Sequence, residues 1–270
     1  MTTVLRPLST GELLDRTFSL YKAHFVLFVG IIALPHLATL VFGLVSLPLR
    51  RYLGLGMFEW FFIAIGLALL VGAISQAATI VAVSEVYLGR PTGIVDSYMK
   101  VRFSLVGVIL LTFVMGVACG LGAMLLVVPG FVLAMMWSLA VPAAVLEDQG
   151  IVDAMTRSAD LTRGFRWRVF VIWLLFFVLT ISVSFLLQWP IRIATLAAIK
   201  SHTPSTLRWL GAASTVISFF TTCLVGPLAT IAFSLLYYDL RVRKEAFDLQ
   251  LMMDTLDGRE RPAEPSTALS

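Results

Sequence analysis

The stretch that decides the fold is "GIVDAMTRSADLTRGFRWRVFVIWLL", residues 150–175. Its first half alternates acidic and basic residues, whereas its second half is almost wholly apolar. A related pattern stands earlier in the chain, "TGIVDSYMKVRFSLVGVILL" at 92–111. A polar amphipathic helix that runs directly into an apolar segment is typical of a chain that lies on a membrane surface before it enters the bilayer. Both stretches therefore predict an interfacial helix followed by a membrane span.

The composition favours lipid as the solvent of most of the chain. Hydrophobic residues make up 59% of the 270 residues, and charged residues make up only 13%, about half the share that covers the surface of a soluble domain. The mean hydropathy is +0.93. The net charge of +4 does not indicate a nucleic-acid partner, because the basic residues lie at the ends of apolar runs and form no separate patch.

Six apolar stretches are long enough to cross the hydrocarbon core, which takes about 20 helical residues. We expect an all-α polytopic membrane protein whose spans form three hairpins, with a tight turn at Val128-Pro129-Gly130 between the third and the fourth. The expected spans are about 25–48, 60–86, 104–128, 131–147, 168–189 and 209–237. Amphipathic interfacial helices are expected at about 9–22, 92–102, 150–164 and 239–257. Residues 1–257 would form one domain, followed by a disordered tail at 258–270.

The basic residues also predict the orientation. With six spans, one side of the membrane receives 15 Lys and Arg residues and the other side receives five, which are Arg50, Arg51, Arg192, Lys200 and Arg208. The side with more Lys and Arg is normally cytoplasmic, so both termini are predicted to be cytoplasmic. Residues 1–23 lack the apolar core of a cleavable signal, so the first span is expected to act as an uncleaved anchor.

The helix expected at 150–164 divides into two faces at helical spacing. The charged side chains would point to water and pair along the helix, Asp153 with Arg157 and Asp160 with Arg163. The apolar face would consist of Ile151, Val152, Met155 and Ala159. Arg166 and Arg168 would then anchor the head of the fifth span among lipid headgroups, as Tyr237 and Tyr238 would at the end of the sixth.

A cytoplasmic polar network is the main candidate site. Glu147 ends an apolar run, and a carboxylate in low dielectric needs a cationic partner, for which Arg157 or another basic residue of an interfacial helix is expected. This pairing favours a structural clamp over a catalytic or transport carboxylate. The candidate members are Glu147, Asp153, Arg157, Asp160, Arg163, Asp239, Arg241, Arg243 and Glu245.

Three more polar residues, His36, Gln76 and Glu85, stand in or near the apolar stretches. An ionisable group at membrane depth is a functional candidate. For His36 the competing interpretation is a neutral imidazole that binds the carbonyl of Ile31, which Pro35 deprives of its helical N–H. Gly116 and Gly120 on the third span would permit close helix packing, and Pro142 and Pro227 would interrupt the fourth and sixth spans.

No catalytic triad order, metal-ligand spacing or phosphate-binding loop stands in the sequence, so neither a cofactor nor a catalytic residue is expected. Cys119 and Cys223 both lie within apolar runs and are expected to be buried as free thiols. A threefold repeat of an interfacial helix plus a membrane hairpin is indicated by "LLD" at 13–15 and "IVD" at 94–96 and 151–153.

Several motifs together resemble a bacterial family, the glycerophosphoryl diester phosphodiesterase membrane domain, and its relatives of unknown function such as the YciC-like proteins. The motifs are "VVPGFVLAMMWSLAVPAAVLED" at 127–148, the Arg-Ser-x-x-Leu-Thr-x-Gly run at 157–164 and the Tyr-Asp-Leu-Arg-x-Arg-x-Glu run at 238–245. The resemblance extends to about residue 250 and implies a bacterial inner-membrane module. It does not imply phosphodiesterase activity, which in this family belongs to a separate barrel domain.

These observations favour a non-enzymatic inner-membrane protein with a structural or accessory role at the cytoplasmic leaflet, in envelope or lipid homeostasis. Its partners would be membrane lipids and a cytoplasmic or membrane protein, without nucleic acid. The first alternative is a transporter or lipid translocator that uses His36 and Gln76. An intramembrane enzyme ranks last, because no nucleophile or metal set converges.

Overall fold

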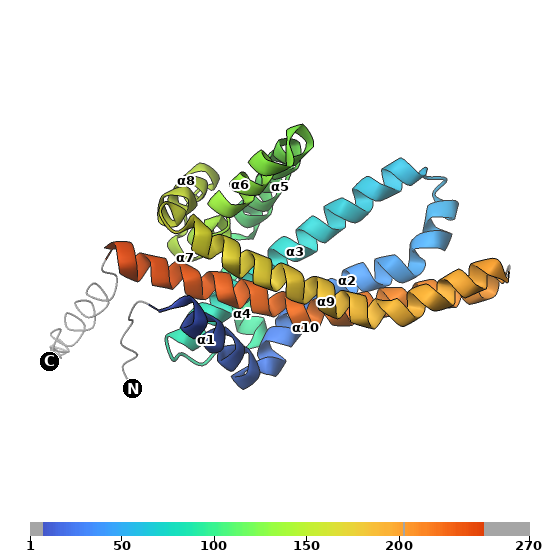
Figure 1. Ribbon diagram of the computed structural model, residues 1–270, viewed down its shortest axis with the longest axis horizontal. Helices are drawn as coiled ribbons and strands as arrows, with labels where there is room; N and C mark the ends of the chain where they lie inside the picture. The colour runs from blue at the N-terminus through green and yellow to red at the C-terminus, as the bar shows by residue number, and fades with distance from the viewer. Residues whose placement is uncertain (1–7, 202, 246–270) are drawn as a thin grey trace, which may run out of the picture.

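The computed structural model describes residues 8–201 and 203–245, which contain ten helices and no strand (Figure 1). One short helix followed by two long helices forms a set, and this set occurs three times along the chain. In the second set the last long helix is divided into two shorter ones. The bounds are α1 Thr10–Ala23, α2 Phe25–Tyr52, α3 Met57–Tyr87, α4 Ile94–Val101, α5 Leu105–Leu125, α6 Val127–Met136, α7 Ala140–Glu147, α8 Ile151–Thr162, α9 Arg166–Lys200 and α10 Pro204–Glu245. The predicted tail at 258–270 and the second part of the predicted 239–257 helix lie outside the described residues.

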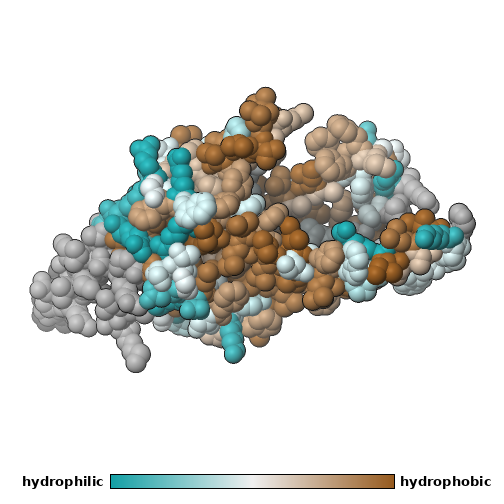
Figure 2. All heavy atoms as spheres, in the orientation of Figure 1, coloured by the Kyte–Doolittle hydropathy of each residue, from teal (hydrophilic) through white to brown (hydrophobic). Residues whose placement is uncertain are grey.

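Six segments of the described chain are long and apolar enough to cross a membrane: α2, α3, α5, α6 together with α7, α9 and α10. Figure 2 shows a hydrophobic middle between two hydrophilic ends. We call the end that holds α1, α4 and α8 the charged end, and the end with the α2–α3 and α9–α10 connections the far end (Figure 1). Exposed Phe, Leu, Ile and Val side chains cover the outside of the long helices, the stable arrangement when the surrounding solvent is lipid.

Helix α10 is the centre of the packing. It contacts α9, α2, α3 and α1, and it reaches α7 and α8 with its last turns. Its buried face includes Ile231, Leu236 and Tyr237, none of which exposes any of its surface. The largest part of the core therefore lies in the half of the molecule near the charged end, where α10 passes between the other helices.

The turn between α5 and α6 differs from the prediction. It lies at Leu126, and Pro129 and Gly130 belong to the first turns of α6. Proline fits there because the first N–H groups of a helix have no intrahelical acceptor. A Cβ on Gly130 would lie 2.4 Å from the backbone nitrogen of Ala123, so this glycine allows α5 and α6 to touch. Gly116 and Gly120, which the sequence suggested for close packing, meet no backbone within 4 Å.

The fourth predicted span, 131–147, is not one continuous helix. Helix α6 ends at Met136 and α7 begins at Ala140, with Trp137–Leu139 forming a turn between them. Conversely, α9 continues without a break through Pro190 to Lys200, well past the predicted end at 189. Helix α10 likewise passes from the predicted sixth span to Glu245, so the terminal helix expected from 239 does not start as a separate element.

Acidic residues cap two of the short helices, α1 and α4. Asp96 accepts a hydrogen bond from the backbone N–H of Gly93 at 3.1 Å, and Glu12 does the same for Ser9 at 2.7 Å. Both stand three residues after the N-cap, the position of a capping-box acid. In α1 this position belongs to Glu12, so Asp15 of "LLD" is not the equivalent of Asp96 and Asp153.

Candidate functional site

The inner face of α8 differs from the predicted apolar face. Its buried residues are Ala154, Ser158, Leu161 and Thr162, whereas Val152, expected on the apolar face, is 73% exposed. The helix is rotated because two of its hydroxyl side chains bind main-chain groups of the α6–α7 turn. Small and polar side chains therefore form the contact face, a pattern that apolar periodicity does not reveal.

Those two hydroxyls complete the backbone hydrogen bonds of the interrupted helix. Ser158 donates to the carbonyl of Met136 at 2.8 Å and accepts from the N–H of Leu139 at 3.1 Å, and Thr162 lies 3.4 Å from the same carbonyl. Within a membrane protein, irregular backbone is stable only where the protein itself supplies the missing partners. Helix α8 is the element that makes the break in the fourth span possible.

Glu147, at the end of α7, is the centre of a first ion cluster. Arg157 of α8 lies 3.1 Å from its carboxylate, Arg241 of α10 lies 3.5 Å away, and the hydroxyl of Tyr237 donates to it. Glu245 binds Arg157 and Arg241 in turn. The hydrogen bond to Glu245, aided by Glu147, raises the pKa of the Arg157 guanidinium despite its partial burial. Two acids and two bases thus join α7, α8 and α10 without net charge.

Asp239 is the centre of a second cluster and exposes none of its side chain. Arg168 of α9 lies 2.6 Å from its carboxylate and Arg243 lies 2.9 Å away. The backbone N–H of Leu8 donates to Asp239 at 2.5 Å, while the carbonyl of Leu8 accepts from both arginines. The cluster joins α9 and α10 to the residues just before α1, so the partly buried Arg168 is an ion-pair partner and not the lipid-headgroup anchor expected from sequence.

A third set of contacts joins α3 to α4 and α10. Glu85 lies 3.1 Å from Lys100 of α4. Next to it, the hydroxyls of Ser84 and Tyr238 lie 2.7 Å apart, and the rings of Tyr238 and Tyr87 stack at 5.5 Å. Tyr238 is buried, as is Tyr237. The tyrosine pair expected at interface depth is therefore part of the protein interior.

The structure brings six of the nine predicted network residues into these clusters: Glu147, Arg157, Asp239, Arg241, Arg243 and Glu245. Asp153, Asp160 and Arg163 stay exposed. The expected pairing of Arg157 with Asp153 is replaced by its contacts with Glu147 and Glu245. Only the main-chain carbonyls of Asp160 and Arg163 take part, both accepting from Lys244. Sequence reasoning missed Arg168, Tyr237, Ser158 and Leu8.

The proline in α2 is compensated by a neighbouring helix. Pro35 has no N–H for the carbonyl of Ile31, and the hydroxyl of Tyr98 in α4 donates to that carbonyl instead. Burial raises the pKa of Tyr98 to about 12, so the donating form persists at neutral pH. The imidazole of His36, for which a hydrogen bond to the carbonyl of Ile31 was one interpretation, lies instead 2.9 Å from the carbonyl of Ile32 and 3.2 Å from the hydroxyl of Ser75. Gln76 is half-buried one residue further along α3.

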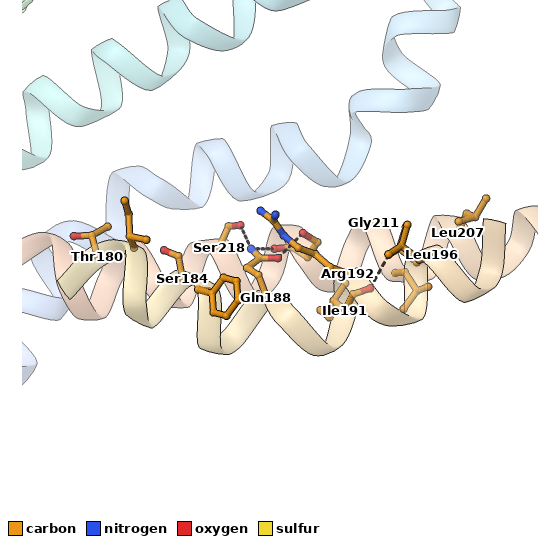
Figure 3. A pocket seen from close by; sticks show the side chains of 14 residues that line it. Thr180, Ser184, Gln188, Ile191, Arg192, Leu196, Leu207, Gly211 and Ser218 are labelled. Carbon is orange, nitrogen blue, oxygen red and sulfur yellow. Dashed lines mark hydrogen bonds between the residues drawn. The ribbon is translucent and has the colours of Figure 1, made fainter. Parts of the chain in front are cut away.

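A groove lies on the α9–α10 pair toward the far end, with a volume of about 1120 Å³ (Figure 3). Four of its polar residues on α9 recur every four positions, Thr180, Ser184, Gln188 and Arg192. Gln188 donates to Ser218 at 2.6 Å, and Ser214 donates to Gln188 at 2.9 Å. These bonds join the two helices at the floor of the groove.

Comparison with known proteins adds no relative: no family model, no curated protein and no solved structure matches the chain. Within residues 8–201 and 203–245 no three His, Cys, Asp or Glu side chains gather closely enough to hold a metal ion. The geometry of the ion clusters and of the groove is therefore the basis for a functional proposal.

Proposed function

We propose that the protein is a non-enzymatic, six-span protein of the bacterial inner membrane with the charged end and both termini in the cytoplasm. Its spans would form three membrane hairpins, and α1, α4 and α8 would lie at the cytoplasmic interface. Its role would be structural or accessory, at the cytoplasmic leaflet, in envelope or lipid homeostasis. The strong excess of Lys and Arg on that side supports the orientation.

The observation that carries this proposal is how the carboxylates of the charged end are used. Glu147 and Asp239 each contact two arginines. A general acid or base needs a pKa near the working pH and access to substrate, whereas a carboxylate held between guanidiniums is a fixed structural anion. The contacts join α7, α8, α9 and α10 with Leu8, which stands before α1, and leave the outer face of α8 available for lipid or protein.

The residues of one motif that resembles the glycerophosphoryl diester phosphodiesterase membrane domain family have structural roles in this fold. In the Arg-Ser-x-x-Leu-Thr-x-Gly run, Arg157 binds Glu147, Ser158 and Thr162 complete the α6–α7 turn, and Leu161 is buried. Gly164 ends the helix region with φ of +87°, a conformation that favours glycine. Each named residue of the Arg-Ser-x-x-Leu-Thr-x-Gly run thus has a physical role in this fold. Such roles would be expected of a motif of the glycerophosphoryl diester phosphodiesterase membrane domain family.

A photocrosslinking amino acid at Val152 tests the proposed contact surface, because this exposed position lies on α8 outside the ion clusters. The control is the same probe at Leu53, which is 52% exposed at the far end. We expect an adduct with anionic lipid or with one specific protein that is enriched at Val152. Identical bulk-lipid adducts at both positions would contradict a specific role for the charged end.

Labelling of single cysteines with a membrane-impermeant reagent tests the orientation. Probes at Gly54, Leu126 and Ser201 should react from the periplasmic side, and a probe at Gln149 should react only after the membrane is opened. Reaction of Leu126 and Gln149 from the same side would overturn the six-span arrangement.

A second candidate, a lipid translocator, is favoured by the polar groove on α9 and α10. Lipid exchange between the leaflets of reconstituted vesicles would test it, with Gln188→Leu as the variant because Gln188 lies at the groove floor. Exchange that is absent in the wild type removes this candidate and leaves the structural role standing.

A further inference from the structure

The depth of Arg192 follows from the charges along α9. Between Arg168 and Arg192 the helix carries no charged residue. At 1.5 Å per residue the two arginines are about 36 Å apart, slightly more than the roughly 30 Å hydrocarbon core. With Arg168 fixed at the charged end, Arg192 lies at headgroup depth in the opposite leaflet. Gln188, Ser184 and Thr180 follow at successive turns below it, toward the middle of the membrane.

Unlike Arg157 and Arg168, Arg192 has no carboxylate partner among the described residues. It is exposed at the groove that Gln188, Ser184 and Thr180 also line. The far end has five basic residues, with Glu59 as its one acid in the sequence. A guanidinium at the membrane interface has a natural counter-ion in a phosphate group, which it binds with two parallel hydrogen bonds.

The rest of the groove suits the other parts of a lipid. Most of its lining is apolar, including Ile181, Phe185 and Leu196. Gln188 is already bonded to Ser214 and Ser218, and Thr180 donates to the carbonyl of Phe176. The hydroxyl of Ser184 can donate to an ester oxygen of a lipid backbone. Its volume of about 1120 Å³ exceeds the roughly 300–1,000 Å³ of ordinary small-molecule pockets.

We infer that this groove is a binding site for one phospholipid molecule. The phosphate binds Arg192, the glycerol ester region lies against Ser184 and Gln188, and an acyl chain follows the apolar wall formed by Ile181 and Phe185. The site belongs to the leaflet opposite the charged end. It does not depend on the proposed structural role, because it uses none of the ion-cluster residues.

Native mass spectrometry of the delipidated full-length protein in detergent tests this site, with phosphatidylglycerol and diacylglycerol as probes. The wild type should retain phosphatidylglycerol in preference to diacylglycerol, which lacks the phosphate. Arg192→Gln should weaken phosphatidylglycerol binding about tenfold and remove the preference. Arg208→Gln is the matched control: it removes one positive charge at the same end but outside this groove, and it should bind as the wild type does.

A second pair of variants tests the groove itself. Ser184→Phe fills the groove and should weaken binding of both probes, whereas Ser182→Phe, two residues away and not in the lining, should not. The proposal would be overturned if Arg192→Gln bound phosphatidylglycerol as the wild type does, or if both arginine variants lost binding equally. It would also be overturned if the wild type were a dimer that Ser184→Phe dissociates, because the groove would then hold a second copy of the chain. Competition by soluble glycerol 3-phosphate would also overturn it, since the site would then bind a free phosphate ester.

Discussion

The two ends of the molecule use arginine in opposite ways. At the charged end, Arg157 binds Glu147 on the preceding helix and Glu245, which is 88 residues away. Arg168 binds Asp239, which is 71 residues away. At the far end, Arg192 lies on a groove formed by two consecutive helices that are held together there by Gln188. The charged end is therefore stabilised by long-range ion pairs, whereas the far end depends on local contacts within each helix pair.

The largest effect should come from Asp239→Asn, because it leaves Arg168 and Arg243 around a buried group that no longer carries the compensating charge. Removing one partner of a buried ion pair costs about 3–5 kcal/mol. The whole molecule should lose that free energy of unfolding in detergent, measured by denaturant titration. Asp160→Asn, at an exposed position of the same end, should stay within about 0.5 kcal/mol. A small effect of Asp239→Asn would mean that the ion cluster does not hold the charged end together.

The next effect in size concerns a contact within one helix pair. In Gly130→Ala the new Cβ would meet the backbone of Ala123, so α5 and α6 must separate at a cost of about 1–3 kcal/mol. Hydrogen exchange should increase in α5 and α6 and stay unchanged in α9 and α10. Gly120→Ala, which meets nothing within 4 Å, is the control. Increased exchange throughout the molecule would contradict the local character of this contact.

An effect of comparable size is expected at Tyr98. Tyr98→Phe leaves the carbonyl of Ile31 without a donor, which costs about 1–3 kcal/mol for a buried group. In a Pro35→Ala background the restored N–H can serve this carbonyl, so the same substitution should cost less. A double-mutant cycle of unfolding free energies measures the difference, and equal costs in both backgrounds would show that the hydroxyl does not compensate for the proline.

The pH dependence of stability gives a related check on the same hydroxyl. The folded-state pKa of Tyr98 is raised to about 12 from the usual value near 10. The contribution of the Tyr98 hydroxyl to the free energy of unfolding is therefore present below pH 10 and is lost between pH 10 and 12. Over this range the wild type should lose more stability than Tyr98→Phe. Parallel pH profiles would contradict the assignment.

The smallest effect should be that of Arg192→Gln on the stability of the lipid-free protein. Since Arg192 has no carboxylate partner among the described residues, its loss should change the unfolding free energy by no more than about 0.5 kcal/mol. Arg168→Gln, which leaves Asp239 with a single arginine, should cost several times more. A comparable loss in both variants would remove the contrast between the two ends.

Much of the architecture was predictable because apolar runs of membrane length leave few alternatives. The six long helical segments and the three short helices before α2, α5 and α9 are found close to the expected positions. The contact of Glu147 with Arg157 was also expected, since a carboxylate at the end of an apolar run needs a nearby cation. The turn at Leu126 was misplaced because Pro-Gly is typical of turns but also fits the first turn of a helix.

The amino-acid sequence alone determined that the long helices are apolar and that the charges gather at the ends of the spans, because both follow from the cost of placing polar groups in lipid. Only the tertiary structure decided which charges meet. Arg168 binds Asp239 across 71 residues, and Ser158 closes a helix break 22 residues away. Such partners depend on the rotation and packing of whole helices, which the local periodicity of a single segment does not contain.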